Sequence, residues 1–157
     1  MELAVYMIGK TDNPALEGLI QDYEKRLKHY IKCRFELLPD LKNRKSLSEE
    51  VQKKQEGQKL LQQLSPSDHV VLLDEKGKSF TSVGLSNWLE KKFHTGAKRC
   101  CLLIGGPYGF AQEVHQRAQE KIALSSLTFT HQMVRLILVE QLYRACTIIK
   151  NENYHHH

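Results

Sequence analysis

Residues 100–109 read Cys-Cys-Leu-Leu-Ile-Gly-Gly-Pro-Tyr-Gly, an apolar run that ends in a glycine-rich loop. The apolar run predicts a buried strand. The glycines let the backbone approach a ligand closely, although a purely structural tight turn has the same composition. In an open α/β sheet, ligands bind at the carboxyl ends of the strands, where this loop would lie. The G-G-x-x-G spacing fits neither a dinucleotide fingerprint nor a P-loop, which disfavours a Rossmann cofactor or a nucleoside triphosphate.

Strands and helices alternate on both sides of this loop. This alternation predicts an α/β domain with a mostly parallel sheet flanked by helices. With 157 residues and no repeat or linker, we treat residues 1–157 as a single domain. Apolar runs predict strands at 3–8, 35–38, 69–73, 100–104 and 122–124, and amphipathic spacing predicts helices at 14–29, 46–64, 85–93, 111–119 and 131–149.

Two charged stretches of the sequence predict local structure, a helix in one case and a turn in the other. Ser46, with Glu49 three residues later, forms a capping-box pattern, so we expect a helix that begins at Ser46. Residues 52–59 of that helix include no apolar side chain, which predicts a solvated helix or one that reaches for a partner. Residues 74–78, Asp-Glu-Lys-Gly-Lys, are typical of a charged turn after the preceding strand.

The positive charge is concentrated in one segment. The chain carries a net charge of +5, and residues 24–59 alone hold 11 Lys or Arg against 6 Asp or Glu, which is the same excess. This segment is distant in sequence from the glycine loop. It is compatible with an ordinary solvated surface and with contact to RNA phosphates, so both interpretations stay open.

Cysteine usage and hydropathy exclude several classes. No C-x-x-C or C-x-C pattern is present, which argues against a zinc site, and adjacent cysteines on a strand point to opposite faces and cannot easily bridge. We therefore expect reduced, buried thiols and no metal. The chain shows no signal-peptide pattern and no apolar run of the ~20 residues that span a membrane, so we expect a soluble cytoplasmic protein.

The last helix, 131–149, is apolar around nearly its whole circumference. Such a helix needs central placement or a subunit interface, which predicts a homodimer through this helix. Glu140 and Arg144 are four residues apart and can pair with each other. Arg135 lacks an evident partner and needs one, either a ligand phosphate or carboxylate or an intersubunit salt bridge.

Taken together, these features resemble the ribosomal RNA large-subunit methyltransferase H family. The resemblance spans essentially the whole chain. The tail departs from the family pattern, because His156 and His157 follow Tyr154-His155 where the family has a basic residue. The matching runs are Gly9-Lys10, Tyr23 to Leu27, Ile104 to Gly109, Leu124 to Arg135, Glu140 to Ala145 and Tyr154-His155.

The resemblance implies a SPOUT-type α/β fold with a C-terminal trefoil knot, which periodicity alone would not reveal. It also implies a homodimer that uses S-adenosylmethionine to methylate N3 of a pseudouridine in 23S rRNA, in the loop of helix 69. The small size of the chain suggests that it reads the assembled ribosome. The alternative, suggested by the basic segment, is an RNA- or ribosome-binding module without enzymatic activity.

Cofactor positions follow from the same resemblance. It implies Leu73 at the end of its strand and Ile104, Gly105 and Gly106 in the glycine loop. The absence of side chains at the two glycines suits close approach of a cofactor. A third group of positions is the stretch Leu124, Ser125, Ser126, Leu127, Thr128 and Phe129.

Methylation of an imide-like nitrogen requires loss of its proton. His131 and His155 are candidates for the base or for an orienting group, and Tyr154 can stack on the acceptor base or bond to it. Arg135 and Arg144 can bind phosphate or stabilise a developing oxyanion. These roles stay unranked, and we expect the tail to lie over the acceptor.

Overall fold

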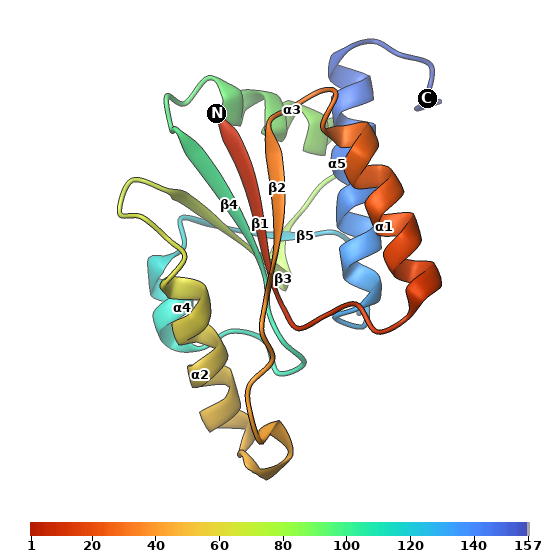
Figure 1. The fold of residues 1–157 in the computed structure, drawn as a ribbon. Coiled ribbons are helices and arrows are strands. Elements are labelled where there is room, and N and C mark those ends of the chain that lie inside the picture. Colours follow the sequence, from red (N-terminus) through yellow and green to blue (C-terminus); the bar gives the residue numbers. More distant parts are fainter. Residues whose placement is uncertain (157) are drawn as a thin grey trace.

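The computed structural model describes residues 1–156, which form a five-stranded sheet in which every pairing is parallel (Figure 1). The strand order is β2-β1-β4-β3-β5. The prediction of a mostly parallel α/β sheet is therefore confirmed. The strands are β1 (Glu2–Ile8), β2 (Cys33–Leu38), β3 (His69–Ser79), β4 (Arg99–Ile104) and β5 (Glu120–Ala123).

Helices cover both faces of the sheet. One face carries α1 (Pro14–Leu27), α3 (Ser82–Phe93) and α5 (Met133–Ile149), and the other carries α2 (Glu49–Leu61) and α4 (Gln112–Arg117) (Figure 1). The alternation along β1 explains why both faces need cover, because successive side chains point to opposite faces. Leu3, Val5 and Met7 join one core cluster, whereas Ala4, Tyr6 and Ile8 join the other.

The adjacent cysteines of β4 divide in the same way. Cys100 belongs to the cluster under α1, α3 and α5, and Cys101 belongs to the cluster under α2 and α4. All four cysteines are buried and free. The prediction of reduced, buried thiols is confirmed. In addition, none of the helices within residues 1–156 has the length and apolar character needed to span a bilayer.

The start and the burial of α2 both differ from the sequence prediction. Ser46 lies in a separate short 3-10 helix (Arg44–Ser46), and Ser48 is the N-cap, whose hydroxyl accepts from the Val51 N–H at 3.3 Å. The expectation of a solvated helix holds for only one face: Lys54, Gln55 and Gln58 are exposed, whereas Gln52 and Glu56 are buried. A polar pair that satisfies part of its own hydrogen bonding can be buried, and composition alone does not reveal this.

The charged stretch after Leu73 continues the strand instead of forming a turn. Ile122 of β5 is in register with both Leu73 and Lys78 of β3, with an irregularity between them. Gly77 allows this close approach, because a Cβ there would lie 2.6 Å from the Ile122 backbone. Residues 74–77 lie between these two pairings and form the irregularity of the strand at the carboxyl edge of the sheet.

Candidate active site

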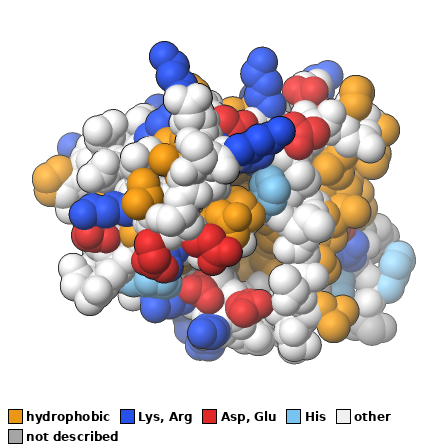
Figure 2. All heavy atoms as spheres, turned by 90° about the horizontal axis from the view of Figure 1, so that it is seen from below, with side chains coloured by type: hydrophobic (Ala, Val, Ile, Leu, Met, Phe, Trp, Pro, Cys, Tyr) orange, Lys and Arg blue, Asp and Glu red, His pale blue; other side chains and the backbone are white. Residues whose placement is uncertain are grey.

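A cavity of about 780 Å³ opens at the carboxyl edge of the sheet, where β3, β4 and β5 end. Its walls come from the three segments that follow these strands, which is the binding position expected for an open parallel sheet. Seen from below, this edge shows a recess with apolar side chains in it, and acidic and basic side chains intermixed around it (Figure 2). The cavity thus combines an apolar interior with a charged rim.

Nine of the ten predicted cofactor positions line this cavity. The exception is Ser126, which does not contribute to its lining. The neighbouring Ser125 turns the loop, since its hydroxyl accepts from the Leu127 N–H at 2.9 Å. The lining positions are Leu73, Ile104, Gly105, Gly106, Leu124, Ser125, Leu127, Thr128 and Phe129.

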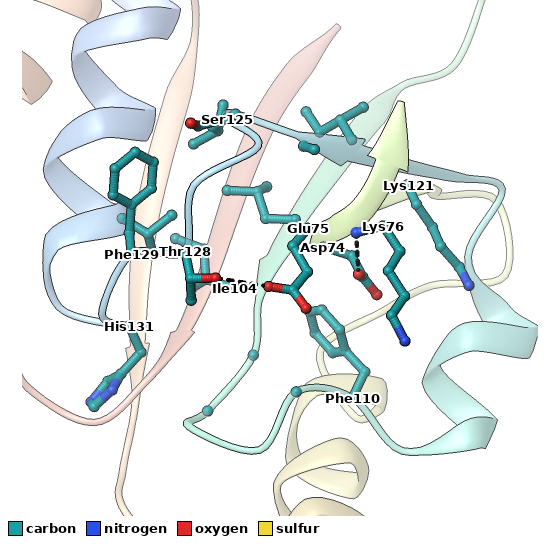
Figure 3. Close-up of a pocket in the computed structure, with 18 of the residues that line it drawn as sticks. Asp74, Glu75, Lys76, Ile104, Phe110, Lys121, Ser125, Thr128, Phe129 and His131 are labelled. Atoms are coloured by element: carbon teal, nitrogen blue, oxygen red, sulfur yellow. Dashed lines mark hydrogen bonds between the residues drawn. The ribbon is translucent and has the colours of Figure 1, made fainter. Parts of the chain in front are cut away.

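A side-chain hydrogen bond ties two walls of the cavity together. The Thr128 hydroxyl donates to Glu75 Oε2 at 3.1 Å, and so connects the loop after β5 with the continuation of β3 (Figure 3). Phe129, Thr128 and His131 lie on one side of the cavity, with Lys76 and Lys121 on the other (Figure 3). The pocket therefore depends on long-range contacts between segments about 50 residues apart.

Packing, and not only space for a ligand, explains the paired glycines. A Cβ on Gly105 would lie 3.3 Å from the Gly109 backbone and from the Phe110 ring. A Cβ on Gly106 would lie 2.2 Å from Glu56 Oε2, on the side of α2. The predicted reason for Gly106, approach of a cofactor, is thus incomplete, because the Glu56 carboxyl already occupies that position.

Glu56 is a buried acid directly behind the glycine loop. Its side chain is 2% exposed, Gln52 donates to Oε1 at 2.9 Å, and Oε2 has no hydrogen-bond partner within the described residues. Burial raises the pKa of Glu56, which favours the neutral carboxylic acid. A neutral acid is compatible with the apolar surroundings of the loop.

His131 is the one predicted catalytic candidate that lines the cavity within the described chain. Burial lowers its pKa, and the positive charges of Arg135 and Arg44 lower it further. The imidazole is therefore neutral at neutral pH and able to accept a proton. Arg44 also shows that the basic segment is not remote from the site, since β2 carries it to this edge.

Arg135 is a structural anchor. It is 2% exposed and donates to the carbonyls of Ile8 at 2.6 Å and Gly9 at 3.0 Å, and to the Thr11 hydroxyl at 3.2 Å. These acceptors replace the phosphate, carboxylate or intersubunit partner that the sequence analysis expected. The correction has a simple cause: strand ends present unpaired carbonyls, which sequence patterns do not reveal. Arg135 thereby fixes the start of α5 beside β1.

The remaining catalytic candidates lie at the opposite end of α5. Arg144 pairs with Glu140 at 2.6 Å, as predicted, and its Nη1 lies 3.5 Å from His155 Nδ1. The Tyr154 hydroxyl donates to Glu140 at 3.0 Å. With 17 residues, α5 is about 25 Å long, so the tail does not cover the cavity of its own chain (Figure 1). The expectation that the tail lies over the acceptor stays a prediction, which a single chain does not fulfil at its own cavity, and His157 lies outside the described residues.

Sequence reasoning missed several charged and aromatic residues of the cavity. Treating residues 74–78 as a charged turn concealed Asp74, Glu75 and Lys76, although they directly follow an apolar strand run and so lie at the binding edge. Within residues 1–156, no three His, Cys, Asp or Glu side chains come together as metal ligands. The missed lining residues include Asp74, Glu75, Lys76, Tyr108, Phe110, His115 and Lys121.

The fold and pocket define an α/β protein with a ligand cavity at the carboxyl edge of a parallel sheet. Residues 1–155 match the family model described as predicted SPOUT methyltransferase. The chain therefore belongs to the SPOUT methyltransferases, and its full-length relatives place it in the ribosomal RNA large-subunit methyltransferase H family.

Three of these relatives are named ribosomal RNA large subunit methyltransferase H. The protein of Christiangramia forsetii is 55% identical, and those of Flavobacterium johnsoniae and Parabacteroides distasonis are each 53% identical. In all three cases the match covers 99% of this chain and 99% of the relative. The similarity is thus not confined to one motif or one half of the fold.

Proposed function

We propose that this protein transfers a methyl group from S-adenosylmethionine to N3 of a pseudouridine in 23S rRNA, in the loop of helix 69 on the assembled, cytoplasmic ribosome. The observation that carries the proposal is the cavity that gathers nine of the ten expected cofactor positions from three separate loops. The names of the relatives support rRNA as the substrate class. The precise nucleoside rests on the family resemblance.

The lining residues fit such a cofactor. Leu73, Ile104 and Leu124 offer an apolar surface for an adenine ring, and the loop backbones offer N–H and C=O groups for its edge. Glu75 directs a carboxylate toward the cavity, which suits a cationic ligand (Figure 3). When bound, the cofactor would supply an electrophilic methyl group on sulfur, so the protein mainly has to position the two reactants.

The chain's own residues divide the proton chemistry between them. His131, kept neutral at the cavity, is placed to accept the N3 proton. His155, whose Nδ1 lies 3.5 Å from Arg144 Nη1, is a candidate to orient the acceptor base. Arg144 can stabilise the negative charge that develops on a carbonyl oxygen of that base.

His131 and His155 can meet only if a second copy contributes its tail. An antiparallel pairing of the two α5 helices would bring the tail of one protomer to the cavity of its partner, and a two-fold axis would complete both sites. Met133, which is 44% exposed at the start of α5, and Leu127, which is 71% exposed, support an apolar interface at this end. The homodimer is part of the proposal.

A trefoil knot is also part of the proposal. Ile122 of β5 pairs with both Leu73 and Lys78 of β3. This pairing supports the knot, because the chain of β3 continues past β5 before it enters α3. The hydrogen bond from Gln132 to the Lys10 carbonyl at 2.9 Å joins the loop before α5 to the loop after β1. Both features are compatible with a chain threaded at this edge.

Calorimetry and mass spectrometry together test the methyltransferase proposal. We expect saturable binding of S-adenosylmethionine, lost in Gly105→Leu because its Cβ is already confined by Gly109 and Phe110 and the rest of the side chain must fill the cavity. Gly18→Leu is the matched control, since a Cβ at Gly18 meets nothing within 4 Å. rRNA from cells lacking the protein is expected to lack one methyl group.

The binding-module alternative predicts different results. It requires salt-dependent RNA binding that is indifferent to the cofactor, with no saturable heat at millimolar S-adenosylmethionine. Arg44, whose charge reaches His131 at the cavity, favours RNA contact under either hypothesis. Removal of residues 154–157 distinguishes the two further, because the enzyme is expected to retain cofactor affinity and lose methyl transfer.

A further inference from the structure

The described part of the C-terminal tail, residues 150–156, is attached to the end of α1. The Tyr30 hydroxyl donates to Glu152 Oε2 at 2.5 Å, and the hydroxyls of Tyr23 and Tyr154 lie 3.2 Å apart. The paired residues are 122 and 131 positions apart in the sequence. These contacts therefore determine where the tail lies on the fold, and not merely how it turns locally.

Aromatic packing surrounds these hydroxyls. Tyr143 of α5 lies at the centre, with ring centroids 5.9 Å from Tyr23, 5.7 Å from Tyr30 and 4.8 Å from Tyr154. The Arg144 guanidinium lies 4.7 Å from the centre of the Tyr154 ring. Ring contacts give packing energy with broad geometric tolerance, whereas hydroxyl hydrogen bonds fix direction.

The hydrogen-bond directions in this cluster are determined. The Tyr154 hydroxyl has one proton, and the Glu140 carboxylate accepts it at 3.0 Å. Tyr23 must then donate to the Tyr154 oxygen. Burial raises the pKa of Tyr154, as do its bonds to Tyr23 and Glu140, so the phenol stays neutral. The resulting chain runs from Tyr23 through Tyr154 to Glu140, which also accepts from Arg144.

We propose that Tyr23 of α1 and Tyr30, in the turn that follows α1, are positioning residues that hold the tail in the orientation required for methyl transfer. This inference rests on the proposed function, in which Tyr154 and His155 complete the acceptor site of the partner protomer. Tyr30 fixes the tail at Glu152, before the reactive residues, and Tyr23 fixes the Tyr154 ring itself. Neither tyrosine lines the cofactor cavity.

Phenylalanine substitutions isolate the hydroxyls, because the ring contacts with Tyr143 are kept. In Tyr30→Phe, we expect hydrogen–deuterium exchange of residues 150–156 to become about tenfold faster, the factor that corresponds to loss of a hydrogen bond to a charged group. In Tyr23→Phe, which loses a hydrogen bond to a neutral hydroxyl, we expect a smaller acceleration of about fivefold. We expect kcat for methyl transfer to fall by a similar factor, while the Kd for S-adenosylmethionine stays within about twofold. Glu152→Gln is expected to resemble Tyr30→Phe, and the double variant to add little.

Tyr6→Phe is the matched control. It removes a hydroxyl that accepts from Arg34 at 2.8 Å and Arg99 at 3.2 Å, on the opposite face of the sheet from the tail. We expect it to alter neither tail exchange nor kcat, even if it lowers the melting temperature. A general loss of stability would instead affect Tyr6→Phe and Tyr30→Phe alike.

Two results would overturn the proposal. Unchanged tail exchange in both phenylalanine variants would mean that the hydroxyls do not hold the tail. Faster exchange with an unchanged kcat would mean that the tail's position does not matter for transfer. Absence of methyl transfer by the unaltered protein would instead contradict the proposed function, and the exchange measurement, which needs no activity, would still test the attachment of the tail.

Discussion

Replacement of Arg135 by leucine tests whether this buried arginine supports the fold or binds a ligand. The side chain donates to two backbone carbonyls, those of Ile8 and Gly9, at the end of the interior strand β1. Leucine would leave both buried acceptors without these donors. At about 1–3 kcal/mol for each of these two unsatisfied groups, we expect the free energy of unfolding to fall by about 2–6 kcal/mol. A domain of this size has a total stability of about 5–15 kcal/mol, so the variant would be seriously weakened but still measurable.

Urea denaturation measures this loss, and Arg117→Leu is its control. Arg117 also donates to backbone carbonyls, those of Ser65 at 2.8 Å and Asp68 at 3.1 Å, but it is only partly buried and lies away from the cavity. We expect Arg117→Leu to cost less than about 1.5 kcal/mol, because water can replace the guanidinium. A loss below about 1 kcal/mol for Arg135→Leu, together with weaker RNA binding, would refute the structural role and restore the phosphate-binding interpretation.

Three further expectations concern packing and titration. Gly77→Ala places a Cβ 2.6 Å from the Ile122 backbone and is expected to lower the free energy of unfolding in urea by about 1–3 kcal/mol. Gly18→Ala, in open space, is its control and is expected to be neutral or slightly stabilising. Equal effects of the two substitutions would contradict the close approach at Gly77. The His131 NMR titration is expected to have its midpoint below 6.5. The contribution of His131 to the stability of the fold is then complete above that pH and is lost as the pH falls. Arg44→Ala is expected to raise the midpoint, and a midpoint at or above 6.5 in the unaltered protein would argue against burial of the ring. The four cysteines are buried, with pKa values raised to about 11 to 12, so we expect no reaction with Ellman's reagent before unfolding, and rapid labelling of the folded protein would contradict their burial.

The fold was largely predictable because its signals are local. Apolar runs that end in charged or glycine-rich loops identified all five strands, and helical spacing identified the five α-helices. The errors fall where local patterns are ambiguous. Ser46 and Ser48 both suit an N-cap, and the difference depends on the short helical turn before Ser48. Residues 74–78 are charged like a turn, yet they belong to β3, which pairs with β5 again from Lys78 onward.

The residues that line the candidate site could be predicted from the sequence, but the hydrogen-bond partners of its supporting residues could not. The glycine loop and the 124–129 stretch follow strands, so their convergence at one edge follows from parallel topology. The partners of Arg135 are backbone carbonyls, and those of Tyr30 and Tyr23 lie more than 120 residues away, so no spacing rule indicates them. Glu56 was concealed by composition, because a buried carboxyl and a solvated one look the same in a sequence.

The two ends of α5 have complementary roles, and this relates the basic segment to the site. At its start, Arg135 anchors the helix to β1 beside the neutral His131, while at its end Arg144 and Tyr154 organise the tail. The segment 24–59 divides in the same way: Arg26 lies 6.0 Å from the Tyr143 ring beside the tail, and Arg44 is close enough to His131 to lower its pKa. In an antiparallel dimer, each composite site would then have positive charge from both protomers around it. The excess charge that looks remote from the chemistry in one chain would thus surround the acceptor RNA in the dimer we propose.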